Sequence, residues 1–312
     1  MGTWDEIPPE IQQSVVKYMD LRSRTEFRQS NRLMQALVDQ TPLQIEAISF
    51  IREFDMATNI DLIRFSIAEK SGENYKLYSF HFKNDAENDN RSLEKYEDND
   101  LVSEKNLGEK SHVAEAYETL KRILMIPNIR FQQATFSADL NFEIDFEGLI
   151  HAQNVQISQN FQWLPKFAPN IEKLIVFNNI PVNLQFCQTI QFKTAKDVFL
   201  DVPNQNCDEH EILEFCAHRI QFASTTLSTR IIKAVLRKLY MNAVNLQSDS
   251  RFLCLADDNA NLEEISEGFE VISRTPPNSD RKVYRIDFQR RMLELILDSS
   301  GLDVVFEAKF VE

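Results

Sequence analysis

The densest group of potential metal ligands lies between residues 207 and 218. It contains two cysteines and two histidines, namely Cys207, His210, Cys216 and His218. Two thiolates and two imidazoles can bind Zn²⁺ tetrahedrally. These ligands are separated by two, five and one residues, and that spacing matches no common zinc module. We therefore predict no metal here and expect a buried cysteine and surface histidines. An enzyme that uses this cluster is the third hypothesis for the chain.

Other catalytic patterns are lacking in the sequence. None of the six glycines forms a phosphate-binding loop or a dinucleotide fingerprint. Neither the G-x-S-x-G nor the H-E-x-x-H motif is present. The four cysteines and five histidines show no nucleophile–base signature, and they are too few for the paired metal clusters of a RING ligase. The sequence thus predicts a protein that is not an enzyme, with no catalytic residue and no cofactor.

Composition narrows the class of partner. The formal net charge of -14 argues against nucleic-acid binding, because phosphates require a basic surface. The apolar runs are much shorter than a bilayer requires, so no membrane partner is expected. The N-terminus does not read as a signal peptide, and the four cysteines have no framework spacing. We therefore expect reduced thiols and a cytoplasmic or nuclear location. A chain of 312 residues is long enough for about two domains.

Apolar residues recur at helical spacing over the first forty residues. A double proline precedes a first helix predicted over residues 10–18, because the first helical turn tolerates proline. The capping-box spacing from Ser23 to Glu26 predicts the start of a second helix. A third apolar stripe predicts a helix that ends at Asp39. Three short helices cannot build a core alone, so they must share apolar surface with a partner or with the following domain.

The N-terminal segment has a distinctive order of residues: Ile7-Pro8, Glu10, Ile11, Val15-Val16 and Met19, followed by Asp20-Leu21-Arg22-Ser23-Arg24 and Phe27-Arg28. In this order it resembles an F-box of the nematode type. The segment departs from the common F-box pattern at Arg24, Ser30 and Met34, where leucine, valine and tryptophan are usual. The resemblance implies that residues 1–42 bind a Skp-family adaptor and, through it, a cullin. The alternative is a helical cap that only seals the next domain.

The resemblance also implies a set of adaptor-binding and supporting apolar residues. This set is Ile7, Pro8, Ile11, Val15, Val16, Met19, Leu21, Phe27, Leu33 and Leu37. Some of these residues must instead pack inside the module, and the sequence does not distinguish the two groups.

Residues 43–83 form a predicted β-rich connecting segment. A strand is expected over 45–50, and the alternating segments 60–68 and 76–82 predict a β-hairpin. Residues 84–110 carry nine acids, four bases and few apolar residues, so we predict a disordered acidic loop.

From residue 111 onward the pattern alternates between helix and strand. A helix is predicted from Ser111. Strand-like segments then recur about every twenty to twenty-five residues, within the leucine-rich-repeat range. The strands are expected at 129–136, 155–158, 174–177, 198–202, 220–223 and 244–247, with helices at 161–167, 184–190, 209–217 and 228–241. We predict parallel strands with helices on one face. Alternating segments between 265 and 310 predict an antiparallel meander.

The predicted fold class is therefore an α+β chain with an α/β repeat: the three-helix F-box, an irregular leucine-rich-repeat-like β-α array, and a terminal meander. This arrangement is similar to nematode F-box proteins with an associated C-terminal domain, most closely the FTH type. The similarity implies that residues 111–312 select a target protein for a Skp–cullin–F-box ubiquitin ligase. A non-degradative scaffold of leucine-rich-repeat-like repeats is the second hypothesis. The sequence assigns no target-binding residue.

Overall fold

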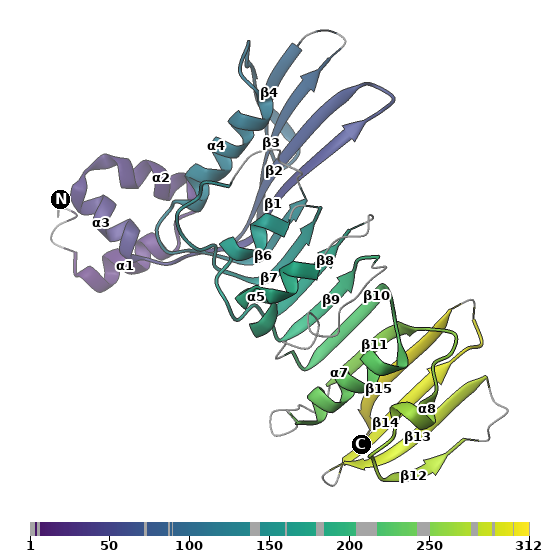
Figure 1. The fold of residues 1–312 in the computed structure, drawn as a ribbon. Helices are drawn as coiled ribbons and strands as arrows, with labels where there is room; N and C mark the ends of the chain where they lie inside the picture. Colours follow the sequence, from purple (N-terminus) through teal and green to yellow (C-terminus); the bar gives the residue numbers. More distant parts are fainter. Residues whose placement is uncertain are drawn as a thin grey trace. The chain divides into compact units, whose positions relative to one another are not determined.

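The computed structural model divides the chain into two compact units (Figure 1). The first unit contains Met1–Val155 with Lys166–Ala168, and the second contains Gln156–Pro165 with Pro169–Glu312. The structure describes residues 4, 7–71, 74–86, 88, 90–137, 144–159, 161–178, 184–203, 217–241, 250–275, 280–288, 291–301 and 303–311. No helix in these ranges is long and apolar enough to cross a membrane.

Three short helices open the first unit, as predicted. They are α1 (Pro9–Lys17), α2 (Leu21–Ser30) and α3 (Arg32–Gln40). The predicted cap of the second helix was wrong, because α2 begins before Ser23. The Asp20 carboxylate accepts a hydrogen bond from the Ser23 backbone N–H at 2.8 Å, so Asp20 is the N-cap. A carboxylate caps a helix at least as well as a hydroxyl does.

The strands of the first unit follow the order β6-β1-β2-β3-β4-β5. They are β1 (Leu43–Asp55), β2 (Ile60–Ser71), β3 (Asn74–Asp85), β4 (Asn90–Glu97), β5 (Asp100–Asn106) and β6 (Ile129–Ser137). β1 and β6 are parallel, and the other neighbours are antiparallel. The predicted strand at 45–50 and the predicted hairpin over 60–82 are confirmed.

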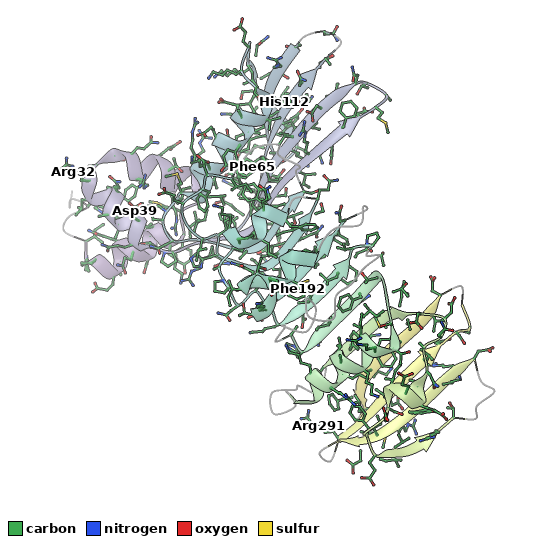
Figure 2. The ribbon with its side chains drawn as sticks, viewed as in Figure 1. Arg32, Asp39, Phe65, His112, Phe192 and Arg291 are labelled. Carbon is green, nitrogen blue, oxygen red and sulfur yellow. The ribbon has the colours of Figure 1, made fainter. Side chains whose placement is uncertain are left out.

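Helix α4 (His112–Leu124) lies against β2, β3 and β4 (Figure 1). Its predicted N-cap is confirmed, since the Ser111 hydroxyl accepts a hydrogen bond from the Ala114 N–H at 3.4 Å. Beside this helix Phe65 lies in an aromatic cluster, with ring centroids 6.5 Å from Phe50 and 5.6 Å from Phe80 (Figure 2).

The prediction of a disordered loop over residues 84–110 was wrong. Most of this segment is the β4–β5 hairpin, in which Glu97 pairs with Asp100. The two residues between them, Asp98 and Asn99, have φ of 49° and 74°, as a two-residue type I′ hairpin turn requires. The charges also pair across strands: Lys83 Nζ lies 2.6 Å from Glu94 Oε1. Composition alone could not show this, because cross-strand pairing joins residues that are distant in sequence.

Parallel strands separated by helices dominate the middle of the second unit. The strands β8 (Lys173–Phe177), β9 (Asp197–Asp201), β10 (Arg219–Leu227) and β11 (Arg251–Ala256) pair in that order. The helical segments between strands are η2 (Phe161–Lys166), η3 (Leu184–Gln188), α5 (Ile190–Thr194) and α7 (Thr229–Met241). Strand β7 (Ala152–Ser158) has residues in both units. Phe192 is buried in the second unit (Figure 2).

The prediction of parallel strands is confirmed for β8 to β10. The expected strand at 244–247 and the expected helix at 209–217, apart from Ala217, lie outside the described residues. Strand β11, at residues 251–256, was not predicted.

The chain ends in the predicted antiparallel meander. It comprises β12 (Val271–Arg274), β13 (Arg281–Phe288), β14 (Arg291–Asp298) and β15 (Val304–Val311). The first strand is shorter than expected, because the short helix α8 (Leu262–Ile265) occupies its predicted start. The Asn261 side chain caps that helix by accepting a hydrogen bond from the Glu263 N–H at 2.9 Å.

Candidate protein-interaction surface on the N-terminal helices

The inner side of the three helices is a small closed core. Val16 of α1 is fully buried and clusters with Leu37 and Val38 of α3. Trp4, Met19 and Phe27 pack against this cluster, and the Trp4 and Phe27 rings meet edge to face at 5.2 Å. Of the residues predicted to bind an adaptor, Val16 and Leu37 are therefore buried inside the module, and Met19 and Phe27 are partly buried. Leu21 is also buried, at the start of α2.

The outer side of α1 carries a second set of apolar side chains. Ile11 is 53% exposed, Val15 40% and Tyr18 83%. The spacing of these residues is i, i+4 and i+7, which places them on one side of a helix. We call Pro8, Ile11, Val15 and Tyr18 the outer stripe; Pro8 is also exposed. Tyr18 is missing from the predicted set, although its i+7 spacing from Ile11 was the signal that could have found it.

The remaining predicted residues are Leu33 and Ile7. Leu33, on α3, is 55% exposed, and Ile7 is half-buried. The Gln12 side chain amide donates to the Trp4 carbonyl at 2.9 Å and to the Ile7 carbonyl at 3.0 Å. These two bonds hold the segment before α1 against the helix and so position Pro8 at one end of the outer stripe.

Arg24 occupies the position at which an F-box usually has leucine, and the structure gives it a role. Its side chain is almost fully buried. The guanidinium donates to the carbonyls of Thr41 at 2.9 Å, Pro42 at 3.1 Å and Met19 at 3.3 Å. The Thr41 and Pro42 carbonyls follow the end of α3, where backbone acceptors lack helical partners. Arg24 therefore ties α2 to the end of α3, which leucine could not do.

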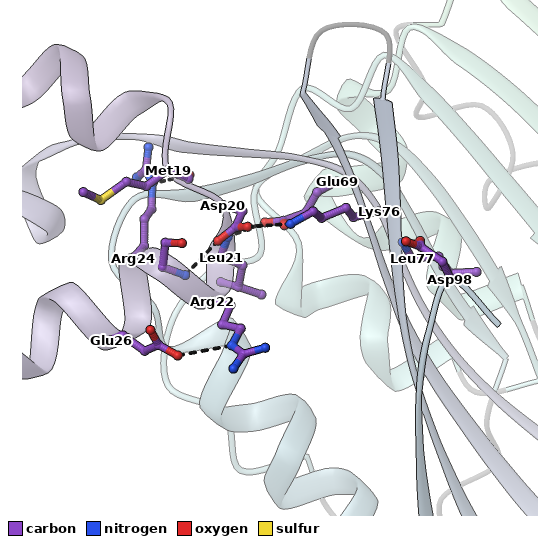
Figure 3. Close-up of polar contacts among 11 residues, drawn as sticks. Met19, Asp20, Leu21, Arg22, Arg24, Glu26, Glu69, Lys76, Leu77 and Asp98 are labelled. Carbon is purple, nitrogen blue, oxygen red and sulfur yellow. Dashed lines mark hydrogen bonds and ion pairs between the residues drawn. The ribbon is translucent and has the colours of Figure 1, made fainter. Parts of the chain in front are cut away.

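Polar contacts also join the start of α2 to the β2–β3 hairpin (Figure 3). Asp20 Oδ2 lies 2.8 Å from Lys76 Nζ, and Glu69 Oε1 accepts a hydrogen bond from the Leu21 N–H at 2.7 Å. The hydrogen bond from Lys76 lowers the pKa of Asp20 to about 2. Burial raises the pKa of Glu69, which is 6% exposed and whose Oε2 has no partner among the described residues.

A groove of about 1080 Å³ lies beside this junction. Helix α1 from Glu10 onward, the start of α2, residues 40–44 and the end of the β2–β3 hairpin line it. Its charged lining residues are Glu10, Lys17, Asp20, Glu69, Lys70 and Lys76. The groove therefore carries three carboxylates and three ammonium groups, and its lining includes neither histidine nor cysteine to form a nucleophile–base pair.

Most of the considered zinc cluster, namely Cys207, His210 and Cys216, lies outside the described residues. His218 is described, and its Nε2 lies 3.3 Å from Asp197 Oδ1. Within the described ranges no three side chains of the metal-binding kinds come together. Cys254 is buried, and that burial raises the pKa of its thiol, which makes the sulfur a poor nucleophile.

The chain was compared with protein-family models, with curated proteins and with solved structures, and none of the three comparisons gives a match. The functional argument therefore depends on geometry. Its clearest element is the outer stripe, an exposed apolar surface on helices whose inner side is already packed.

Proposed function

We propose that this chain is the substrate-recognition subunit of a Skp–cullin–F-box ubiquitin ligase. The single observation that carries this proposal is the outer stripe. Ile11 and Val15 of α1 and Tyr18 at its C-cap are exposed, and none of them belongs to the core of the module. Amphipathic helices bind partners through apolar residues at this spacing. We infer that residues 1–42 bind a Skp-family adaptor, and through it a cullin, by way of the outer stripe and Leu33.

The proposed mechanism is proximity. The N-terminal helices bind the adaptor, and the C-terminal part holds a target protein so that its lysines lie near a charged ubiquitin carrier. The rate gain comes from a raised effective concentration of the two reactants, and this chain contributes no reacting group.

The proposed domain type is an associated domain of leucine-rich-repeat-like, FTH-type character. Two observations support it. Strands β8, β9 and β10 begin 24 and 22 residues apart, and they pair in parallel and in sequence order. Repeats of this length are typical of leucine-rich repeats.

Co-purification of the full chain with a Skp-family adaptor tests the proposal. Replacing Ile11 and Val15 together by aspartate should abolish adaptor binding without unfolding the chain, because both side chains are exposed. Met125→Asp is the matched control, since Met125 is a large apolar side chain of the same unit and is 62% exposed. If the Ile11→Asp/Val15→Asp variant still binds the adaptor, the proposal is wrong.

A second candidate is a non-degradative scaffold whose helices only cap the sheet. The hydrogen bond from the Leu21 N–H to Glu69 and the Asp20–Lys76 pair favour it, because both join the helices to the β2–β3 hairpin. The same experiment separates the two candidates. If the full chain folds and binds no adaptor, the scaffold becomes the favoured candidate.

A further inference from the structure

Strand β5 is an open edge of the sheet in the first unit. It is last in the strand order, and no strand in the described part of the chain pairs with its outer side. All seven of its residues are exposed, including Leu101 at 55% and Val102 at 61%. Leu101 pairs with Tyr96 of β4, and Val102 is the extra residue of a β-bulge, so the two apolar side chains lie exposed at an irregular point of the edge.

An open edge can bind another strand. Inward and outward backbone groups alternate along an antiparallel edge, so about half of the N–H and C=O groups of β5 face away from β4. Natural edges are usually short, twisted or blocked by proline and lysine. β5 has no proline, and its one lysine is Lys105 near its end. Its one irregularity of register lies at Val102, because Leu101 pairs with Tyr96 and Ser103 pairs with Lys95. The outer side of β5 is therefore an unpaired edge with a bulge in its middle.

The charge around this edge determines which partner fits. Between residues 97 and 104 the chain has four acids and no base, the acids being Glu97, Asp98, Asp100 and Glu104. All four are exposed or half-buried. Asp100 and Glu104 lie on β5 itself, whereas Glu97 ends β4 and Asp98 accepts a hydrogen bond from the Leu77 N–H of β3 at 2.8 Å. Opposite charges on adjacent strands stabilise pairing, and like charges oppose it. A second copy of β5 would bring the same acids against each other, whereas an extended segment with lysine or arginine would complement them.

We propose that β5 is the docking edge for an extended, basic segment of a target protein, which adds to the sheet as a further strand. This mode of recognition takes its affinity from main-chain hydrogen bonds and its selectivity from side chains at alternate positions. Apolar residues of the target segment contact Leu101 or Val102, and its basic residues face the acids of the β4–β5 turn. The inference deepens the proposed function, because the bound segment belongs to the protein that the ligase would modify.

The probe is a short fluorescent peptide of alternating lysine and valine, titrated against the full chain and followed by anisotropy. Two control peptides have the same length. One replaces lysine by glutamate, and the other is N-methylated at alternate amides so that it cannot pair as a strand. We expect the lysine peptide to bind at least about tenfold more tightly than either control. Equal binding of the lysine peptide and the N-methylated peptide would overturn the proposal.

The variant that tests the site is Leu101→Lys with Val102→Lys, which blocks the edge as natural edges are blocked. We expect at least about tenfold weaker binding of the lysine peptide. Met56→Lys is the matched control, since Met56 is 88% exposed in the turn between β1 and β2. Unchanged binding by the double variant would overturn the proposal. Analytical sedimentation gives a second test. A dimeric original chain with a monomeric double variant would show that the edge pairs two copies of the chain, and would also overturn the proposal.

Failure of this inference can be distinguished from failure of the proposed function. Adaptor co-purification of the Leu101→Lys/Val102→Lys variant should match that of the original chain, because residues 1–42 are untouched. Conversely, the Ile11→Asp/Val15→Asp variant should keep its peptide binding. If the chain binds the peptide at β5 but binds no adaptor, the ligase role is rejected and the docking edge is retained.

Discussion

Replacement of Arg24 by leucine is a direct test of how the N-terminal helices are held. Leucine is usual at this position in the F-box pattern that the segment resembles, so that resemblance alone predicts a neutral or stabilising change. The structure predicts the opposite, because the Arg24 guanidinium donates to the carbonyls of Thr41, Pro42 and Met19. Leucine offers no donor to these three acceptors.

The size of the effect follows from which acceptors lose access to water. The bond to the Thr41 carbonyl is buried, whereas the other two are partly buried beside the groove. An orphaned buried carbonyl costs roughly 2 kcal/mol, and a partly wet one about 0.5 kcal/mol. Leucine recovers about 1 kcal/mol through apolar burial. We expect the free energy of opening the module to fall by about 2 kcal/mol.

Hydrogen–deuterium exchange of the α2 and α3 amides in the full chain measures this opening free energy locally, which suits a protein with two compact units. Arg22→Leu is the matched control, because the Arg22 side chain is 71% exposed and pairs with Glu26 on the same helix. Its effect should stay within about 0.5 kcal/mol. Arg24→Lys should fall between the two, since an ammonium cannot reproduce the guanidinium fork. Equal exchange in the Arg22→Leu and Arg24→Leu variants would refute the assignment of Arg24 as the tie between α2 and α3.

The neighbouring valines of α1 should behave differently: Val16→Ala should destabilise the module by about 2 kcal/mol, and Val15→Ala by less than about 0.5 kcal/mol, as measured by urea unfolding. Equal losses would contradict the separation of core and outer stripe. For Asp20, the change to asparagine keeps the cap but loses the Lys76 pair, whereas the change to alanine loses both and should cost about 1 kcal/mol more. Because the folded pKa of Asp20 is about 2 and the unpaired value is 3.8, the stability from this pair is present above pH 3.8 and is lost as the pH falls toward 2. An acid-unfolding curve unchanged by Lys76→Met would disprove that link. Burial lowers the pKa of His112, so the folded state binds fewer protons than the unfolded state and stability should decrease as the pH falls below 6.5. His112→Gln should flatten this part of the unfolding profile, and a profile that keeps its slope would exclude His112 as the cause.

Periodic local patterns were sufficient to predict several elements from sequence. The three N-terminal helices, the β2–β3 hairpin, helix α4 with its Ser111 cap, the parallel strands β8 to β10 and the meander were all expected, and the structure has them. Each of these elements has apolar residues at a regular spacing, about 3.6 residues in helices and two in strands. The spacing is regular because each element buries one face. Hydrophobic spacing is a local property, so a single sequence is enough to read it.

The candidate interaction surfaces required the tertiary structure. Val15 and Val16 are chemically identical neighbours, and only the packing of α1 against α3 shows that one is exposed and the other buried. The composition of residues 84–110 predicted a disordered acidic loop. It could not show that charges there pair across strands, as Glu94 does with Lys83. Arg24 looked like a departure from a family pattern until its partners at the end of α3 were located. The sequence by itself thus determined those helices and strands that carry their own apolar repeat, but not β4, β5 or β11. Burial, edge exposure and the partners of charged groups depend on residues far apart in the chain, so only the tertiary structure decided which surfaces are free to bind.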